Sequence, residues 1–410
     1  MKYLASMIVA LFIAVSVSAG IIRVGSKHTH KTVRAGINAA AAGDTVSVDQ
    51  GHYRERNLVI NKRITLKGNN QPILDGESKY EIISVFTSGV TIEGFKLIHS
   101  GVSSLEDLSG IKVSNSSNVT IRNNILEDTF FGIYIQNGSN SRIINNQLRG
   151  TSLEEQRSGN GIHCWKSENM HIARNSISGH RDGIYFEFVK NSVILKNTAA
   201  NNLRYGLHFM FSNDDSYLDN VFRNNGSGVS VMYSKRIKML SNHFEENWGD
   251  AAYGILLKEI SDGTMEGNYF TKNTSAIYME GANRISMKQN TFKDNGWALK
   301  IQANCMDVVL ERNNFIGNTF DVGTNGSLVL NTFRNNYWDK YEGYDLNKDK
   351  IGDIPFRPVS MYSVIVEKFP VAMILFRTFI TTLLDKTEKI LPSLTPENLK
   401  DNEPLMHRAF

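Results

Sequence analysis

A short pattern of apolar and polar positions recurs along residues 110–331. Each copy begins with a small residue, followed by alternating apolar and polar positions, and the last copy is degenerate. The copies begin at Gly110, Gly132, Gly161, Gly183, Gly206, Gly228, Gly254, Ala276, Ala298 and Asp321. Successive starts are 22 to 29 residues apart, most often 22. Alternation of this kind predicts short β-strands with one buried and one outward face.

Asparagines mark two further positions of the repeat. The first row follows 14 or 15 residues after each start: Asn124, Asn146, Asn175, Asn197, Asn220, Asn242, Asn268, Asn290 and Asn313. A second row, five residues further on, is assigned to Asn225, Asn247, Asn273, Asn295, Asn318 and Asn336. Asparagine tolerates left-handed backbone angles at tight corners. Stacked amides also form hydrogen bonds along an axis, so we expect both rows to lie at corners of a stacked structure.

A repeat of about 22 residues built from short strands is typical of a parallel β-helix. It is too short for a propeller blade and lacks helical spacing. One rung cannot bury its own apolar face, whereas stacked rungs join these faces into a continuous interior. The alternative is a β-sandwich with asparagine-rich turns, but a sandwich does not keep such a register over ten units. The sequence therefore predicts an all-β protein, a right-handed parallel β-helix over residues 46–336.

The N-terminal segment carries two further signals. Lys2, the apolar run 4–17 and the small residues before Gly20 have the form of a secretory signal peptide, predicted at 1–19. This places the mature protein outside the cytoplasm. In the segment 20–45, the alanine-rich stretch 32–42 predicts a short helix that covers the first rung, whose open edge would otherwise template aggregation.

The repeat ends before the C-terminus. Residues 337–360 break the period and predict a cap loop, and residues 361–410 predict a helical tail that docks on a membrane partner. Within the tail, residues 370–391 have the apolar spacing of an amphipathic helix. Its apolar part, 370–384, is shorter than the roughly 20 residues that span a bilayer. We therefore expect this helix to dock on a partner or to lie on a membrane surface.

Composition narrows the class of protein. Apolar residues make up 41% and charged residues 21%, which allows a large core and argues against disorder. Of the 7 prolines, none lies between 73 and 354, so no strand there lacks a backbone donor. The net charge of +4 is spread without basic patches, which disfavours a nucleic-acid partner. The 2 cysteines cannot form a disulfide scaffold.

Alternation within each copy separates interior from outward side chains. Counting the first residue as zero, positions one and three are apolar and predicted to be interior, as in Ile162/Cys164, Ile184/Phe186, Leu207/Phe209 and Val229/Val231. Met239, Met265, Met279 and Met287 also fall in interior columns and are predicted to fill the core. Positions two and four are then predicted to face solvent: His163/Trp165, Tyr185/Glu187, His208/Met210, Ser230/Met232, Leu256/Lys258 and Tyr278/Glu280.

Two outward methionines and a histidine are the main candidate site. Met210 and Met232 lie on adjacent rungs, about 4.8 Å apart, and His208 precedes Met210 on the same face by about 6.6 Å. Thioethers with an imidazole suit Cu(I) rather than Ca²⁺, Mg²⁺ or Zn²⁺. His163 is a weaker, fourth candidate ligand. The alternative is an apolar patch on which a partner rests, with Trp165, Tyr185 and Tyr233 contributing.

Two further candidates rest on carboxylates. The cap loop spaces oxygen ligands as a calcium-binding loop does. However, Lys350 stands where an EF-hand has its glycine, and Phe356 stands where it has its bidentate glutamate, so the choice between Ca²⁺ and a hydrogen-bonded turn stays open. The four candidate ligands of that loop are Asp345, Asn347, Asp349 and Asp353.

A polysaccharide lyase or hydrolase would need clustered outward carboxylates. Glu187 and Glu280 are four rungs apart, roughly 19 Å, so only loop residues Asp182, Asp214 and Asp215 keep this enzyme class open.

The sequence also resembles a known family. The segments GDTVSVDQGHY (43–53), LVINKRITLKG (58–68), RYGLHFMFS (204–212), GVSVMYS (228–234) and NYWDKYEGYDLNKDKIGDIPFRP (336–358) occur in this order. Together with the asparagine-cornered rungs they resemble the NosD family, periplasmic β-helix proteins of nitrous-oxide reductase maturation. The resemblance covers residues 30 to 390.

The resemblance implies a periplasmic role without catalysis. It implies as partners an inner-membrane ABC permease with its ATPase, a membrane-anchored copper chaperone and nitrous-oxide reductase. Under this reading His208, Met210 and Met232 hold Cu(I) in transit, and the tail from Pro370 contacts the permease. A polysaccharide-active enzyme or carbohydrate-binding β-helix, and a metal-free scaffold or adhesin, are the rival classes.

Overall fold

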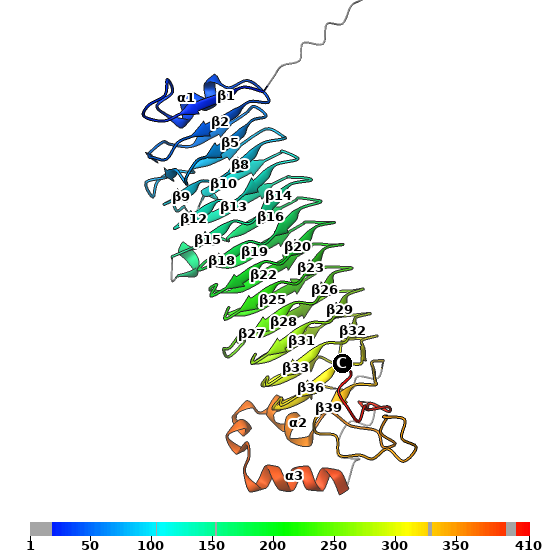
Figure 1. The fold of residues 1–410 in the computed structure, drawn as a ribbon. Helices are drawn as coiled ribbons and strands as arrows, with labels where there is room; N and C mark the ends of the chain where they lie inside the picture. The colour runs from blue at the N-terminus through cyan, green and yellow to red at the C-terminus, as the bar shows by residue number, and fades with distance from the viewer. Residues whose placement is uncertain (1–18, 104, 152–153, 327–329, 391–398) are drawn as a thin grey trace, which may run out of the picture.

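The computed structural model describes residues 19–103, 105–151, 154–326, 330–390 and 399–410. The predicted signal peptide lies, apart from Ala19, outside these residues. The described chain is a right-handed parallel β-helix of about 14 turns, which confirms the predicted fold class. Figure 1 shows the rungs stacked in chain order, with one short helix at the N-terminal end and further helices at the C-terminal end.

Each rung contributes one strand to each of three parallel sheets, named sheets A, B and C. Within the described residues sheet A has 14 strands: β1 (Ile21–Val24), β2 (Thr45–Val48), β5 (Thr65–Gly68), β8 (Thr91–Glu93), β11 (Thr120–Arg122), β14 (Arg142–Ile144), β17 (His171–Ala173), β20 (Val193–Leu195), β23 (Ser216–Leu218), β26 (Lys238–Leu240), β29 (Thr264–Glu266), β32 (Ser286–Lys288), β35 (Val309–Glu311) and β38 (Thr332–Arg334). Sheet B has 13 in the same part of the chain: β3 (His52–Tyr53), β6 (Ile73–Asp75), β9 (Lys96–Ile98), β12 (Ile125–Glu127), β15 (Gln147–Arg149), β18 (Ser176–Ser178), β21 (Thr198–Ala200), β24 (Val221–Arg223), β27 (His243–Glu245), β30 (Tyr269–Thr271), β33 (Thr291–Lys293), β36 (Asn314–Ile316) and β39 (Tyr337–Trp338).

Sheet C carries the repeat starts and the candidate ligands. Among the described residues its 12 strands are β4 (Leu58–Ile60), β7 (Ile83–Val85), β10 (Ser109–Ser114), β13 (Phe131–Gln136), β16 (Ile162–Trp165), β19 (Asp182–Glu187), β22 (Tyr205–Met210), β25 (Ser227–Met232), β28 (Tyr253–Lys258), β31 (Ser275–Glu280), β34 (Trp297–Ile301) and β37 (Phe320–Gly323). Neighbouring strands pair in parallel, with equivalent repeat positions opposite each other.

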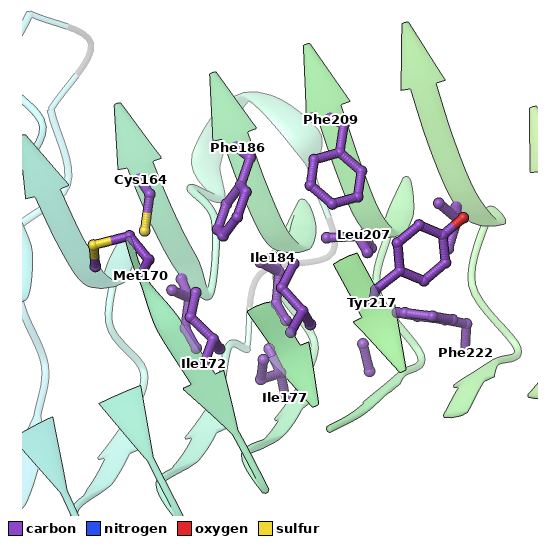
Figure 2. Close-up of a cluster of buried hydrophobic side chains, with 14 of the residues drawn as sticks. Cys164, Met170, Ile172, Ile177, Ile184, Phe186, Leu207, Phe209, Tyr217 and Phe222 are labelled. Atoms are coloured by element: carbon purple, nitrogen blue, oxygen red, sulfur yellow. The ribbon is translucent and has the colours of Figure 1, made fainter. Parts of the chain in front are cut away.

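The interior is a continuous apolar column. Positions one and three of the repeat are buried as predicted, and so are the four interior methionines. Figure 2 shows Cys164, Phe186, Phe209 and Tyr217 pointing into this column. Burial raises the pKa of the Cys164 thiol, so this cysteine is a core residue rather than a reactive thiol.

The first asparagine row forms a buried ladder of side-chain amides. From Asn146 onward, each Oδ1 accepts hydrogen bonds from the backbone and side-chain nitrogens of the asparagine one rung before, as Asn220 does from Asn197. Each Nδ2 donates to the next Oδ1 and to a backbone carbonyl, here Asn242 and Ile194. The predicted amide stacking is therefore correct.

The corner geometry differs from the prediction. The left-handed residue is the one just before each ladder asparagine, with φ between 52° and 64°: Asn123, Asn145, Arg174, Lys196, Asp219, Ser241, Gly267, Gln289, Arg312 and Asn335. Most of these side chains are exposed, so their identity varies. The asparagine that recurs is kept by its buried hydrogen bonds, which other side chains cannot reproduce.

The second ladder was also assigned incorrectly at both ends. It begins one rung earlier than predicted, because Asn202 donates to Asn225. Asn336 belongs instead to the first ladder, since its Oδ1 accepts from Asn313. That ladder ends on Asp401, whose Oδ2 accepts from the backbone and side-chain nitrogens of Asn336 and from the indole of Trp338.

Both ends of the solenoid are covered. At the N-terminal end, helix α1 (Val33–Ala39) buries Val33 and Ile37 against the first rung. It is shorter than the predicted stretch, because the Asp44 carboxylate accepts from the Ala41 backbone N–H and holds the chain in a turn. At the other end residues 399–410 lie across the last rung, so the tail predicted to be helical over 361–410 partly closes the β-helix.

The remaining tail is three short helical segments rather than one long helix. These are α2 (Met361–Lys368), the 3₁₀ helix η2 (Pro370–Leu375) and α3 (Phe379–Ile390). The helix predicted over 370–391 is interrupted because Arg377 has left-handed angles, with φ 61°. Helix α2 packs on the last strands of sheet C, through Tyr362 against Phe320. No helix in the described part of the chain is both long and apolar enough to cross a bilayer.

Candidate metal centre

The two outward methionines lie side by side on sheet C. Met210 ends β22 and Met232 ends β25, and the two residues are direct register partners in the parallel pair. Both side chains are half-buried. The Tyr185 hydroxyl donates a hydrogen bond of 3.6 Å to the Met210 sulfur. The predicted adjacency of the two thioethers follows from this register.

His208 lies two residues before Met210 on the same face of the sheet. Its side chain is nearly buried, and within the described residues neither ring nitrogen has a hydrogen bond of ordinary geometry. Its Nδ1 lies 3.5 Å from Asp182 Oδ2. With its Nδ1–H directed at the Asp182 carboxylate, the neutral ring keeps the lone pair of Nε2 for a metal ion.

Asp182 is held in place by a buried ion pair. Its two oxygens accept from Arg204 Nε at 2.9 Å and Nη2 at 2.6 Å, and the carboxylate is fully buried. Burial alone would raise the pKa of Asp182, but the hydrogen bonds and charges of Arg204 and His208 outweigh it and lower the pKa. The group beside the imidazole is therefore a fixed negative charge.

The outward face is more enclosed than its alternation predicted. His163, His208 and Ser230 face away from the interior, yet they are 9%, 6% and 0% exposed. Aromatic rings cover them: the Tyr205 ring, for example, lies 4.9 Å from that of His208. Strand alternation assigns a side but not what lies over it, so the prediction of solvent exposure was wrong for this part of the column.

His163 does not lie next to the other three candidate ligands. The Tyr185 ring lies between the two imidazoles, 4.7 Å from His163 and 4.7 Å from His208. His163 Nδ1 instead lies 3.3 Å from the Asn160 side-chain nitrogen. Burial lowers the pKa of His163 to about 3, so the ring is neutral at physiological pH.

The acidic cap loop forms a turn held by its own side chains. Asp345 accepts hydrogen bonds from the backbone N–H groups of Lys348, Asp349 and Lys350. Asp353 accepts from the Leu346 N–H, and Asn347 donates to Asp349. In the described residues no three histidine, cysteine, aspartate or glutamate side chains are placed to hold a metal ion. The loop is therefore a hydrogen-bonded turn, and the Ca²⁺ site stays a prediction.

The carboxylates required by the lyase or hydrolase alternative are dispersed. Glu187 and Glu280 lie in one column with three strands between them, as predicted. Asp214 pairs with Arg236, and Asp215 is buried. The paired outward carboxylates of a glycoside hydrolase are not found at these positions.

An exposed aromatic stack lies beside the methionines, and of its three residues the sequence interpretation named only Tyr233. The side chains of Phe188, Phe211 and Tyr233 are 40% to 46% exposed. The ring centroids of Phe188 and Phe211 are 5.2 Å apart, and those of Phe211 and Tyr233 are 5.0 Å apart. Each directly follows the position-four residue of its rung, two of which are Met210 and Met232. Reading position five of the repeat would have shown this stack.

Comparison with known proteins gives two family matches. Residues 149–348 match the family described as "Periplasmic copper-binding protein (NosD)", and residues 16–172 match the "Right handed beta helix region". The first match spans all three residues of the candidate centre.

Similar proteins cover most of the chain. A protein named probable ABC transporter binding protein NosD from Pseudomonas aeruginosa is 28% identical over 90% of both chains. A protein of the same name from Stutzerimonas stutzeri is 24% identical, over 87% of this chain and 85% of its own. The A-module of mannuronan C-5 epimerase AlgE6 from Azotobacter vinelandii has a similar structure, with TM-score 0.54 and 14% identity. That likeness covers 73% of this chain and 93% of the module, and it shows the fold alone. By these matches the chain is similar to the NosD proteins, whose family model is described as periplasmic and copper-binding, and it has the parallel β-helix fold.

Proposed function

We propose that this protein carries Cu(I) in the periplasm as an accessory component of an ABC transporter and catalyses no bond change. In this proposal His208, Met210 and Met232 are the transient ligands, and the copper serves the assembly of nitrous-oxide reductase. The NosD names of the relatives and the copper-binding description of the family support this assignment.

One observation carries the choice of ligands. Met210 and Met232 are register partners on adjacent strands, and His208, whose Nε2 has no hydrogen-bond partner in the described part of the chain, lies on the same face two residues before Met210. Sulfur and imidazole donors select Cu(I) over hard cations such as Ca²⁺. A buried ring nitrogen such as this Nε2 is costly to leave without a hydrogen bond, and a bound ion would use its lone pair.

The chemistry of this donor set suits transfer rather than storage. Neutral thioethers on a half-buried face release Cu(I) more readily than buried thiolates, and both cysteines are buried away from this face. Two adjacent rungs fix the three donors in place, because the strands of a β-helix do not have to become ordered when the ion arrives.

The helical tail is the proposed contact with the permease. Four large apolar side chains on it are 66% to 84% exposed: Phe369, Val371, Ile374 and Phe379. Exposed apolar groups concentrated in one segment mark interaction surfaces in soluble proteins. The membrane-anchored copper chaperone and nitrous-oxide reductase are proposed to approach sheet C beside Met210 and Met232.

Anaerobic titration with Cu(I) in the presence of a competing chelator tests the proposal. We expect about one tight equivalent in the intact protein and its loss in the triple variant His208→Ala, Met210→Ala, Met232→Ala. The matched control is His243→Ala, Met306→Ala, Met373→Ala. It removes the same donor types at partly or largely exposed positions on separate elements, and it should keep the tight equivalent.

Two results would contradict the proposal. One is a tight equivalent that survives in the triple variant while circular dichroism shows it folded. The other is an equal loss in both triple variants, because that would assign binding to scattered surface donors.

A further inference from the structure

A basic groove on sheet A lies apart from the candidate metal centre. It runs across the outward side of β8, β11, β14 and β17 and has a volume of 490 Å³. Four neighbouring strands cover about 14 Å along the axis of the solenoid. The metal candidates lie on sheet C, so this groove is independent of the proposed copper function.

Two guanidinium groups in the groove are without acidic partners. Arg122 is neutralised by Glu93, with Nε to Oε2 at 2.6 Å. In the described part of the chain, by contrast, neither Arg142 nor Arg174 pairs with a carboxylate. Burial lowers the pKa of the neighbouring His171, and the positive charges of Arg142 and Arg174 lower it further. The groove therefore has an uncompensated positive potential.

The rest of the lining is neutral and hydrogen-bonding. Thr91 and Thr120 contribute hydroxyl groups, and Asn123 and Asn145 contribute amides, with the Asn145 Nδ2 donating to the Asn123 Oδ1. Such groups suit sugar hydroxyls, whereas guanidinium groups suit carboxylates, which they bind in a bidentate manner. The unpaired arginines lie on adjacent rungs but at opposite ends of the sheet: Arg142 begins β14, and Arg174 directly follows β17 at the corner. A linear ligand reaches both, whereas a single small anion does not need a groove four strands long.

We propose that this groove binds an acidic oligosaccharide, a chain of uronic acid units lying obliquely across sheet A from Arg142 to Arg174. Arg142 and Arg174 take the carboxylates, and the threonines and asparagines take the hydroxyl groups. The site is one of binding only, since no bond change is required of these residues.

Calorimetric titration with a hexamer of galacturonic acid at low salt tests this. The test variant is Arg142→Ala, Arg174→Ala. The control variant is Lys238→Ala, Arg312→Ala. Lys238 occupies the same strand position as Arg142, three rungs or more away. Arg312 occupies the same left-handed corner position as Arg174, and φ is 54° at each of these two arginines. All four side chains are exposed, and both variants lose two positive charges.

We expect binding by the intact protein and the control, and a dissociation constant at least about tenfold higher in the test variant. A neutral glucose hexamer should not bind. The proposal is overturned if the intact protein does not bind the acidic hexamer, or if both variants bind it equally. It is also overturned if inorganic phosphate or poly-glutamate binds as tightly through the same two arginines, because the groove would then be a site for small anions or acidic polypeptides.

Discussion

Replacing Asn220 by leucine is expected to lower the free energy of unfolding by about 3–6 kcal/mol. The side chain is fully buried, and it exchanges hydrogen bonds with Asn197, Asn242 and the Ile194 carbonyl. Leucine has a similar volume, so the cost comes from polar groups left unpaired in the interior, at about 1–3 kcal/mol each. The break also interrupts the amide ladder in the middle of the stack.

The neighbouring residue supplies the control for this prediction. Asp219 lies in the left-handed corner with an exposed side chain, and asparagine tolerates that conformation. Urea unfolding followed by circular dichroism should place Asp219→Asn close to the intact protein and Asn220→Leu far below it. Midpoints of the two variants that agree within the equivalent of about 1 kcal/mol would show that the ladder does not stabilise the fold.

Asp215→Asn is expected to stabilise the protein at alkaline pH by up to about 5 kcal/mol. Burial raises the pKa of the Asp215 carboxyl to about 8, partly opposed by the hydrogen bond from the Ser192 N–H. The folded protein therefore keeps this proton up to about pH 8, whereas the unfolded chain releases it near pH 4. The unfolded state binds fewer protons between these limits, so stability falls as pH rises from 4 to 8 and levels off above 8.

Unfolding free energies measured from pH 4 to pH 9 test this dependence. The intact protein and Asp219→Asn should lose stability along this range, whereas Asp215→Asn should lose much less and be the most stable of the three at pH 9. At pH 4 the Asp215→Asn variant should have almost no advantage, because the carboxyl is then protonated in both states. An unchanged slope in this variant would show that Asp215 is ionised in the folded protein.

The local pattern along the chain was enough to predict the solenoid. Position one and three residues such as Ile184 and Phe186 repeat often enough to define an interior, and the amide ladder follows from the spacing of Asn124 to Asn313. The corner assignment failed because asparagine has two properties that favour such a position. Its buried hydrogen bonds, rather than its backbone freedom, explain the recurrence at Asn220, and the left-handed angles belong to Asp219.

The candidate centre was predictable only in part. The pairing of Met210 with Met232 follows from the repeat register, which a sequence shows directly. The burial of His208 depends on the Tyr205 ring of its own strand and on the ion pair between Asp182 and Arg204, and this ion pair joins two rungs. The closure of the ladder by Asp401 was equally hidden, because no repeat links residue 401 to Asn336.

X-ray absorption at the copper edge of the Cu(I)-loaded protein tests the central claim most directly. The proposed site of His208, Met210 and Met232 predicts two sulfur neighbours and one nitrogen neighbour around the ion. His208→Ala should remove the nitrogen, and Met210→Ala and Met232→Ala should each remove one sulfur. A coordination sphere of the bound ion that is unchanged in all three variants, or that contains no sulfur, would contradict the assignment of these residues as the copper ligands.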